Sequence, residues 1–436
     1  MFRQVVPHHT YSVGHIWWFV SLVLSSATSL HGASAAMAVS LSMLQLPYAT
    51  PSWYSGRLWL LRLGYYKLSR PKEQADDWVW IVDHTVQIGQ EKCLVILGVR
   101  LSALADRDNC LSHEDVEPLA LLPVKQSNGD IVFQQLQETV AKTGVPRQIV
   151  GDQGSDLHAG VKAFCQAHAE TCSIYDIKHK TACVLKHELQ DDADWQQFTR
   201  LAAQSKLKVQ QTSLAFLAPP QQRSKARYMN VEVLMRWGSN MLFVLDDPGR
   251  LPDGAVDLEV LQEKLGWVGD FRRQLQEWGE LMQVIEIVEH VVRTQGLYRG
   301  VHREVKDLLA PVAHIPRVKR VSTELVAFIA EESFKARPDE RLVGSSEVIE
   351  SVFGKLKRLE QDQSKGGFTG LVLSIAAMVS TTTGEVIQKA LQTVPTKRVL
   401  AWCKETLGQS VQSKRRKAFA RPKETEQKQD QLKAVG

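Results

Sequence analysis

The sequence predicts an α/β protein with a mixed-sheet core to which helical domains are attached. Two observations carry this prediction. Short apolar runs alternate with amphipathic helical segments between residues 76 and 189, and after residue 190 helical patterns occur without strands. The chain has 436 residues, of which 44% are apolar and 23% charged. This composition excludes disorder throughout, a collagen-like repeat and a polytopic membrane protein, and the length allows two or three domains.

Residues 1–75 predict a helical N-terminal domain. Gly32 is expected to interrupt a first helix, and residues 33–46 can form a second. Ser52 is expected to cap a third helix, which Gly64 would end. The segment is therefore expected to form short helices joined by turns.

The third of these helices carries Arg57 and Arg62, and two interpretations of the segment stay open. Short helices with a tight turn and arginines on the last one are typical of a helix-turn-helix, which places a helix in the DNA major groove. A small helical cap on the following domain fits the pattern equally well. A membrane anchor is a further alternative, because residues 4–56 contain no Asp, Glu, Lys or Arg. Serines and a threonine interrupt the most apolar window, residues 15–29, so we expect no membrane span.

Residues 76–189 predict the core of the protein. Apolar segments of strand length are residues 78–82, 93–97, 119–124, 147–150 and about 174–175. Amphipathic segments predict helices at residues 130–143, 156–168 and about 179–189. Pro123 lacks an amide hydrogen, so the third strand is expected at an edge of the sheet. The order of three strands, helix, strand, helix, strand, helix is that of a ribonuclease H-like α/β fold.

The rest of the chain divides into three predicted parts. Residues 190–339 predict a helical domain inserted into the core, and residues 340–400 return to the core as helices. Residues 401–436 are polar and basic, and we predict a disordered tail. Residues 414–433 hold eight basic and three acidic residues, an excess equal to the net charge of +5 of the whole chain. Such a tail fits a polyanionic partner.

Two aspartates fall at the ends of predicted strands. Asp83 follows the first strand and Asp152 the fourth, and these strands are neighbours in a ribonuclease H-like sheet. The two carboxylates should emerge side by side, where a divalent cation would relieve their repulsion. The alternative is that both are turn or cap residues, which Asp often is after a strand. Asp156 is a rival for the second acid, but we expect it to cap the following helix.

A third acid is available on the helix predicted to begin near Ser346, its expected N-cap. Glu350 and Lys357 are seven residues apart, about two helical turns, and so share a face. A carboxylate and an ammonium group on one face suit a metal ion and a nearby phosphate. Glu347 competes for the same role, and an exposed helix with scattered charges is the plainer alternative.

A zinc site is a weaker hypothesis. Its candidate ligands are Cys165, His168, Cys172, His179 and Cys183, whose spacing matches no structural zinc pattern. The six cysteines of the chain also follow no CxxC spacing and no disulfide framework, which fits reduced thiols in the cytosol.

Three sequence strings resemble the DDE transposases of bacterial insertion sequences. The strings are Ile-Val-Asp83-His-Thr, Val-Gly-Asp152-Gln-Gly-Ser-Asp-Leu and Ser346-Glu-Val-Ile-Glu350-Ser-Val-Phe-Gly-Lys-Leu-Lys357. Asp176 and His179 match an Asp-x-x-His signature that many of these enzymes carry. The Glu followed by Lys seven residues later matches the end of their Tyr/Arg/Glu/Lys motif, whose first two positions hold Val343 and Ser346 here.

The resemblance implies a function and a site. Asp83, Asp152 and Glu350 would hold two Mg²⁺ ions, for which Mn²⁺ can substitute. With these ions they would cleave transposon ends and join them to target DNA by phosphoryl transfer. The residues expected to contact DNA, from the resemblance or from their charge, are Arg57, Arg62, Lys178, His179, Arg223, Lys225, Arg227 and Lys357.

The expected partners follow from the same resemblance. They are double-stranded DNA, as terminal inverted repeats and as target, and a second copy of the chain in a homodimer. The expected location is the cytoplasm, in association with the nucleoid, without a membrane. The alternative from another functional class is a catalytically inactive, transposase-derived DNA-binding protein.

Overall fold

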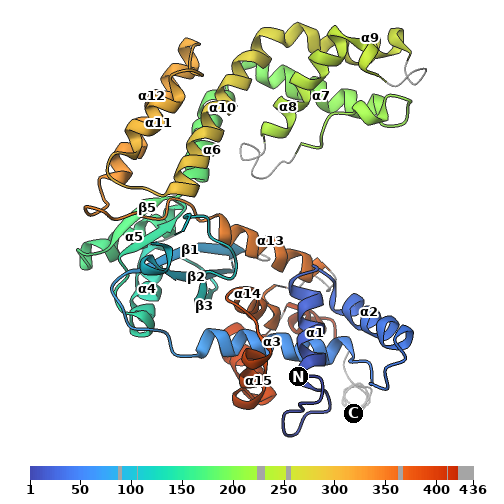
Figure 1. Ribbon diagram of the computed structural model, residues 1–436, viewed down its shortest axis with the longest axis vertical. Helices are drawn as coiled ribbons and strands as arrows, with labels where there is room; N and C mark the ends of the chain where they lie inside the picture. Colours follow the sequence, from blue (N-terminus) through green and yellow to red (C-terminus); the bar gives the residue numbers. More distant parts are fainter. Residues whose placement is uncertain are drawn as a thin grey trace, which may run out of the picture.

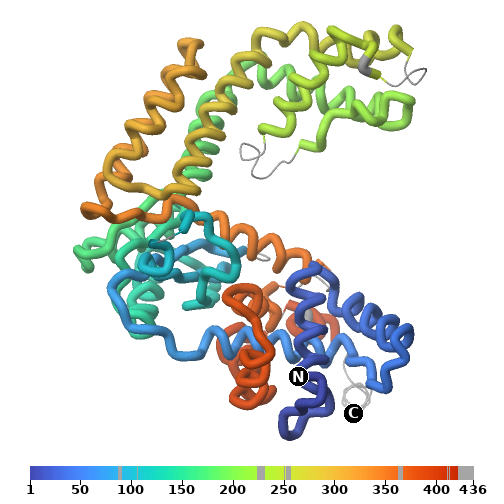
Figure 2. The backbone as a smooth tube through the Cα atoms, viewed as in Figure 1, coloured from blue at the N-terminus to red at the C-terminus, as the bar shows by residue number. Residues whose placement is uncertain are grey.

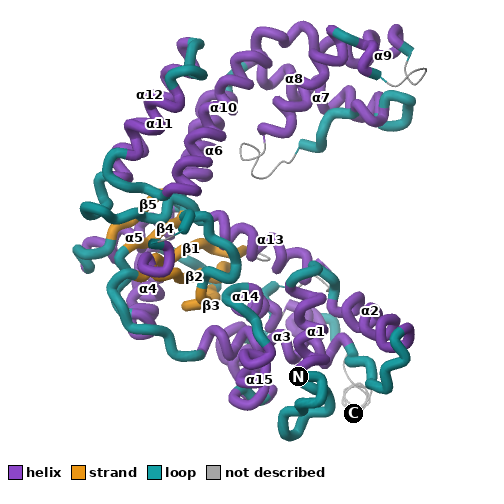
Figure 3. Tube along the Cα trace, in the orientation of Figure 1, coloured by secondary structure: helices purple, strands orange, loops and turns teal. Residues whose placement is uncertain are grey.

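A five-stranded mixed sheet forms the core of the protein. The computed structural model describes residues 1–86, 91–105, 107–222, 231–251, 257–361, 367–409 and 411–420. The strand order is β3-β2-β1-β4-β5 (Figure 3). The strands are β1 (Trp78–Val86), β2 (Lys92–Arg100), β3 (Glu117–Val124), β4 (Gln148–Gly151) and β5 (Cys172–Tyr175). Strands β1 to β3 are antiparallel neighbours, whereas β4 pairs in parallel with both β1 and β5. This is the ribonuclease H-like topology, so the predicted fold class is confirmed.

Both faces of the sheet are covered, which explains why its strands are continuous apolar runs rather than alternating ones. Trp80 and Val82 of β1 pack toward helices α4 (Gly129–Thr143) and α5 (Ser155–Ala167), and the Trp80 and Phe164 ring centroids are 5.7 Å apart. Val79 and Ile81 belong to the larger core on the other face. The prediction that Pro123 marks an edge strand is confirmed, since β3 ends the sheet.

Helical segments separate the two parts of the core in sequence. After α6 (Ile177–Leu189), six α-helices precede the return to the core among the described residues. They are α7 (Ala193–Val209), α8 (Val231–Asp246), α9 (Leu258–Leu265), α10 (Arg272–Gln295), α11 (Val301–Leu309) and α12 (Pro316–Ser333). Figure 1 shows α7, α8 and α9 far from the sheet, joined to it by α6 and the long α10. An aromatic cluster around Phe198, Trp195 and Trp278 forms the interior of this distal part.

The N-terminal segment forms α1 (Val13–Leu24), α2 (Leu30–Met43) and α3 (Trp53–Ser69). The Oγ atom of Ser52 accepts a hydrogen bond from the amide of Ser55 at 3.2 Å, so the predicted cap of α3 is confirmed. Two predicted boundaries are wrong. Gly32 lies inside α2, which Ser29 caps, and Gly64 lies inside α3. A Cβ atom on Gly64 would lie 2.0 Å from the carbonyl oxygen of Leu373, so this glycine permits close packing rather than ending the helix.

Helix α3 is built into the core and does not stand apart from it. It packs against α14 (Leu373–Met378) and α15 (Gly384–Thr393), and Figure 2 shows these segments from opposite ends of the sequence side by side. The buried Lys67 donates from Nζ to the carbonyl oxygens of Val379 and Ser380 at 2.6 and 2.7 Å. This arrangement favours the helical-cap interpretation of α3 over an exposed recognition helix.

Arg62 is also buried, and the prediction that it contacts DNA is wrong. Its guanidinium group donates to the carbonyl oxygens of Val394 and Leu391, both at 2.6 Å, at the end of α15. The group therefore supplies donors to carbonyls that the end of a helix leaves without partners. Only 8% of Arg62 is exposed, which keeps it from a DNA backbone.

We expect Arg62→Met to lower the free energy of unfolding by about 3 kcal/mol, because two buried carbonyl groups would lose a charged donor. Chemical denaturation of the full chain measures this loss. The DNA affinity of the folded variant, measured at a temperature well below its transition, is expected to equal that of the wild type. A variant of normal stability with weakened DNA binding would restore the original assignment.

The C-terminal region is more ordered than predicted. Helix α13 (Glu347–Gln361) is followed by α14, α15, α16 (Thr396–Trp402), a π-helical turn over Cys403–Leu407 and α17 (Val411–Ala418). The prediction of a disordered tail is therefore wrong for residues 401–407 and 411–418, which form helical turns. Within the first of these ranges, Trp402 packs against Tyr65 of α3 with ring centroids 6.4 Å apart. Residues 421–436 lie outside the described part of the chain. Among the described helices, none is long and apolar enough to cross a bilayer.

Candidate active site

Asp83 and Asp152 lie side by side at one edge of the sheet. The last residue pair of the parallel β1–β4 ladder joins Val82 and Gly151, and each aspartate is the next residue of its chain. One detail differs from the prediction, because β1 continues to Val86 along its antiparallel partner β2. Asp83 therefore lies within a strand, at the point where the neighbouring strand β4 ends.

The two carboxylates repel each other. Burial and the charge of Asp152 raise the pKa of Asp83 to about 7, against which a hydrogen bond from the amide of His84 at 2.6 Å and the charge of His179 act. A proton on Asp83, or a cation beside both carboxylates, would relieve this repulsion. Such perturbed acids concentrate at functional sites.

Glu350 brings the third carboxylate, from the first turn of α13. Helix α13 packs against β1, and 28% of the Glu350 side chain is exposed. Burial raises its pKa, partly offset by His179, whose Nδ1 atom lies 3.7 Å from Glu350 Oε1. The charge of Glu350 in turn raises the pKa of Asp83. The three predicted acids thus interact electrostatically although they are distant in sequence.

His179 and Asp176 connect α6 to the start of α13. Asp176 is 1% exposed and accepts hydrogen bonds from the amide and the hydroxyl of Ser346 at 2.5 and 2.9 Å. Burial alone would raise its pKa, but the hydrogen bonds from His179 and Ser346 hold it below its ordinary value. Burial also opposes a charge on His179, yet Asp176 and Glu350 raise its pKa to about 9. His179 is therefore a cation at neutral pH, held between two carboxylates.

Ser346 directly precedes Glu347, the first residue of α13, and thus holds the predicted N-cap position, but its hydroxyl group does not bond the helix amides. Its hydroxyl group donates to Asp176, while the Oγ atom of Ser345 accepts from the amide of Glu347 at 3.2 Å. Sequence reasoning missed this connection because 170 residues separate Asp176 and Ser346. The Asp-x-x-His spacing was the one signal that could have indicated it.

Glu347 is occupied by other partners. Its carboxylate lies 3.0 Å from Arg293 Nη1 of α10 and 3.6 Å from Lys178 Nζ of α6. Arg293 carries no sequence signal that would link it to the site. These ion pairs give Glu347 a structural explanation, and they leave Glu350 as the acid that faces His179.

Asp156 belongs to a separate ion pair. It lies in the first turn of α5, whose N-cap is Gly154, so the expected cap role is wrong. Its Oδ2 atom lies 2.7 Å from Lys92 Nζ and 3.9 Å from His84 Nδ1. Burial would raise its pKa, but hydrogen bonds from Lys92 and Ser127 lower it to about 2.

We expect Asp156→Asn to cost about 1 kcal/mol of stability and to leave DNA cleavage intact. Since the folded-state pKa is depressed to about 2 from its ordinary value of 3.8, the contribution is present above pH 4 and disappears as the pH falls toward 2. Denaturation midpoints of both proteins between pH 2 and pH 6 should therefore converge at the acid end. An inactive but fully folded Asp156→Asn would show that Asp156, and not Asp152, is the second acid.

Carboxylate oxygens are suitable ligands for a divalent cation, but these side chains do not form a complete coordination shell. Hard cations such as Mg²⁺ prefer carboxylate oxygens and keep several waters, so few protein ligands suffice. Within the described ranges, no three His, Cys, Asp or Glu side chains are gathered tightly enough to hold a metal ion. The same finding applies to the candidate zinc ligands, all of which are described residues. For example, His168 Nε2 lies 3.0 Å from Gln137 Oε1.

The remaining predicted DNA contacts are dispersed. Lys357 is exposed on α13, while Arg57 and Lys178 are half-buried on α3 and α6. Arg223, Lys225 and Arg227 lie outside the described residues. Exposed basic side chains are also present on α17 at positions 414–417.

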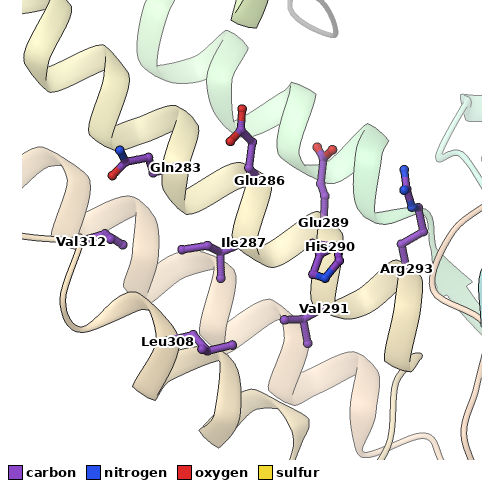
Figure 4. Close-up of a pocket in the computed structure, with 9 residues that line it drawn as sticks. All are labelled: Gln283, Glu286, Ile287, Glu289, His290, Val291, Arg293, Leu308 and Val312. Atoms are coloured by element: carbon purple, nitrogen blue, oxygen red, sulfur yellow. The ribbon is translucent and has the colours of Figure 1, made fainter. Parts of the chain in front are cut away.

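The structure contains one cavity beside Asp152 and a larger one between helices of the insertion. One, of about 450 Å³, adjoins Asp152 and is lined also by His158, Lys162, Tyr175 and Lys335. The other, of about 740 Å³, lies between α10 and α11 and is shown in Figure 4. There Ile287, Val291 and Leu308 form an apolar wall, and Glu289, bonded to Thr181 of α6, lies along its polar side. The first cavity is the one that opens beside a predicted catalytic acid.

The sheet topology and the acids at its edge define a ribonuclease H-like protein with a helical insertion. No protein-family profile and no curated protein matches the sequence. Among solved structures, the chain is similar to a chain of the Drosophila P element transposase strand transfer complex. The match has a TM-score of 0.36 and 10% identity, and covers 90% of this chain and 94% of that chain. A likeness of this size carries no argument about function.

Proposed function

We propose that this protein is a transposase that cleaves DNA ends and joins them to target DNA by metal-assisted phosphoryl transfer. The observation that carries the proposal is the electrostatic coupling of Asp83 to Asp152, Glu350 and the cationic His179, together with the adjacent positions of Asp83 and Asp152 at the end of the β1–β4 ladder. The strings around these acids resemble DDE transposases of bacterial insertion sequences, and this resemblance supports the assignment to cleavage and joining of DNA ends.

Each side chain has a distinct task in this proposal. Asp83, Asp152 and Glu350 would together hold two Mg²⁺ ions. Bound Mg²⁺ would activate a water or a DNA 3′-hydroxyl group and stabilise the leaving oxygen. His179 orients Glu350 and can donate to a phosphate oxygen, because its ring is protonated at neutral pH. Asp176 positions His179 and the start of α13, which carries Glu350, through its bonds to His179 and Ser346.

The proposed partners are the terminal inverted repeats, the target DNA and a second copy of the chain. Lys357, Lys178 and Arg57 contribute phosphate contacts, as do the exposed cations of α17. Such contacts give affinity that falls steeply with salt. The proposed location is the bacterial cytoplasm at the nucleoid. Mn²⁺ is expected to support the reaction in place of Mg²⁺.

One experiment tests the proposal. The full chain is incubated with labelled DNA carrying the terminal repeats that flank its gene, with Mg²⁺ or with EDTA. Mg²⁺-dependent cleavage at the repeat tips is expected, followed by joining to a second DNA. Binding without cleavage would support the alternative of an inactive, transposase-derived DNA-binding protein. Neither binding nor cleavage would overturn both functions.

A further inference from the structure

Helix α2 is apolar on two opposite sides, although the chain covers only one of them. Leu30, Ala33, Met37 and Leu41 are buried against the N-terminal core. On another face, Ala35, Val39 and Met43 follow one another at four-residue spacing and are exposed, Val39 to 58% and Met43 to 80%. A helix that is apolar on two sides is normally covered on both of them.

The exposed apolar surface continues beyond the helix. Leu44, Leu46 and Tyr48 in the connector to α3 are 65%, 40% and 40% exposed. We call the exposed side chains of Ala35, Val39, Met43, Leu44, Leu46 and Tyr48 the α2 surface. Figure 1 shows α2 at the outer edge of the molecule, away from the sheet and from the insertion. Exposed apolar side chains gathered along one segment in this way are typical of an interaction site.

The absence of charge from this segment selects the partner. Residues 4–56 contain no Asp, Glu, Lys or Arg, so the segment offers no cation to a DNA phosphate or an anionic lipid. It equally offers no charge to complement a charged protein surface. In a two-fold contact the same surface meets itself, and any net charge would face a like charge. An uncharged apolar surface is therefore complementary to its own copy.

We infer that the α2 surface binds the α2 surface of a second copy of this chain in a two-fold symmetric dimer. The inference specifies the interface of the dimer named in the proposed function. It rests on the proposed function only for the reason why two copies would pair. Association through this surface needs neither DNA nor Mg²⁺, so its test is independent of catalysis.

The test measures the mass of the full chain in solution without DNA or metal, across a range of concentrations. The wild type is expected at twice the chain mass of 49.0 kDa. The variant Val39→Glu/Met43→Glu is expected at 49.0 kDa, with a dissociation constant raised about a hundredfold or more. Both positions are exposed, so folding should be retained, which thermal unfolding verifies. The matched control is Leu207→Glu on α7, where the replaced side chain is 71% exposed, and it should remain dimeric.

A charge exchange completes the design. Mixing Val39→Glu/Met43→Glu with Val39→Lys/Met43→Lys should restore a dimer at low salt, because opposite charges then face each other across the two-fold axis. A wild type that stays monomeric, or a glutamate variant that stays dimeric, would overturn the inference. Binding of the wild type, but not the glutamate variant, to phosphatidylcholine vesicles together with a monomeric mass would assign the surface to a membrane instead.

Discussion

Replacing Asp83 or Asp152 by asparagine is expected to abolish DNA cleavage while leaving DNA binding unchanged. Each substitution removes one negative charge from the pair that would hold Mg²⁺. A bound metal ion stabilises the charge of the transition state by several kcal/mol. The loss of cleavage should therefore be roughly a thousandfold or more. Cleavage of a labelled end and a binding titration on the same DNA measure the two effects separately. Asp156→Asn is the matched control, since it changes the same functional group four residues further along the chain, in the first turn of α5.

A second readout of the same variants does not depend on activity. Because burial and Asp152 raise the pKa of Asp83 to about 7, the pair is repulsive without a cation. Asp83→Asn should relieve this repulsion and raise the melting temperature in EDTA by about 2 °C. Added Mg²⁺ should stabilise the wild type and not the variants. A Mg²⁺-dependent stabilisation that persists in both aspartate variants would contradict this metal site.

Glu350→Gln is expected to eliminate hydrolysis and strand transfer at every Mg²⁺ or Mn²⁺ concentration, whereas Glu347→Gln should keep measurable activity. The two glutamates occupy the same helical turn but have different partners. Glu350 faces His179, and Glu347 pairs with Arg293 and Lys178. Cleavage of a labelled end by both variants measures the difference. An active Glu350→Gln beside an inactive Glu347→Gln would reverse the assignment.

Lys357→Ala should give a defect between these two. Lys357 is exposed two turns after Glu350, where a phosphate contact rather than a metal ligand would be lost. Its defect relative to the wild type should therefore shrink as salt rises, because the variant makes one phosphate contact fewer and its binding depends less steeply on salt. A defect independent of salt would contradict a phosphate contact.

The strands and the two aspartates could be predicted because their signals are local. An apolar run followed by Asp identifies both Asp83 and Asp152, and the order of elements determines which strands are neighbours. The end of β1 could not be predicted, because the partner strand β2 extends it beyond Asp83. The sequence of β1 alone carries no mark of that pairing.

The errors concern side chains whose partners are distant in sequence. Arg62 has the local appearance of an exposed helical arginine, but its acceptors are the carbonyls of Leu391 and Val394. Gly64 has the local appearance of a helix end, but the backbone at Leu373 decides its role. Propensity describes a helix in isolation, whereas these residues are determined by tertiary contacts more than 300 positions away.

The contacts of α3 also determine when the protein can complete its folding during synthesis. Arg62 and Lys67 emerge from the ribosome 310 to 332 residues before the carbonyl groups that satisfy them. At translation rates of about 5–20 residues per second, α3 waits roughly 15 to 60 s with two cations and an apolar face exposed. A nascent chain that already carries Asp83 and Asp152 thus lacks its final support until α14 and α15 have been made.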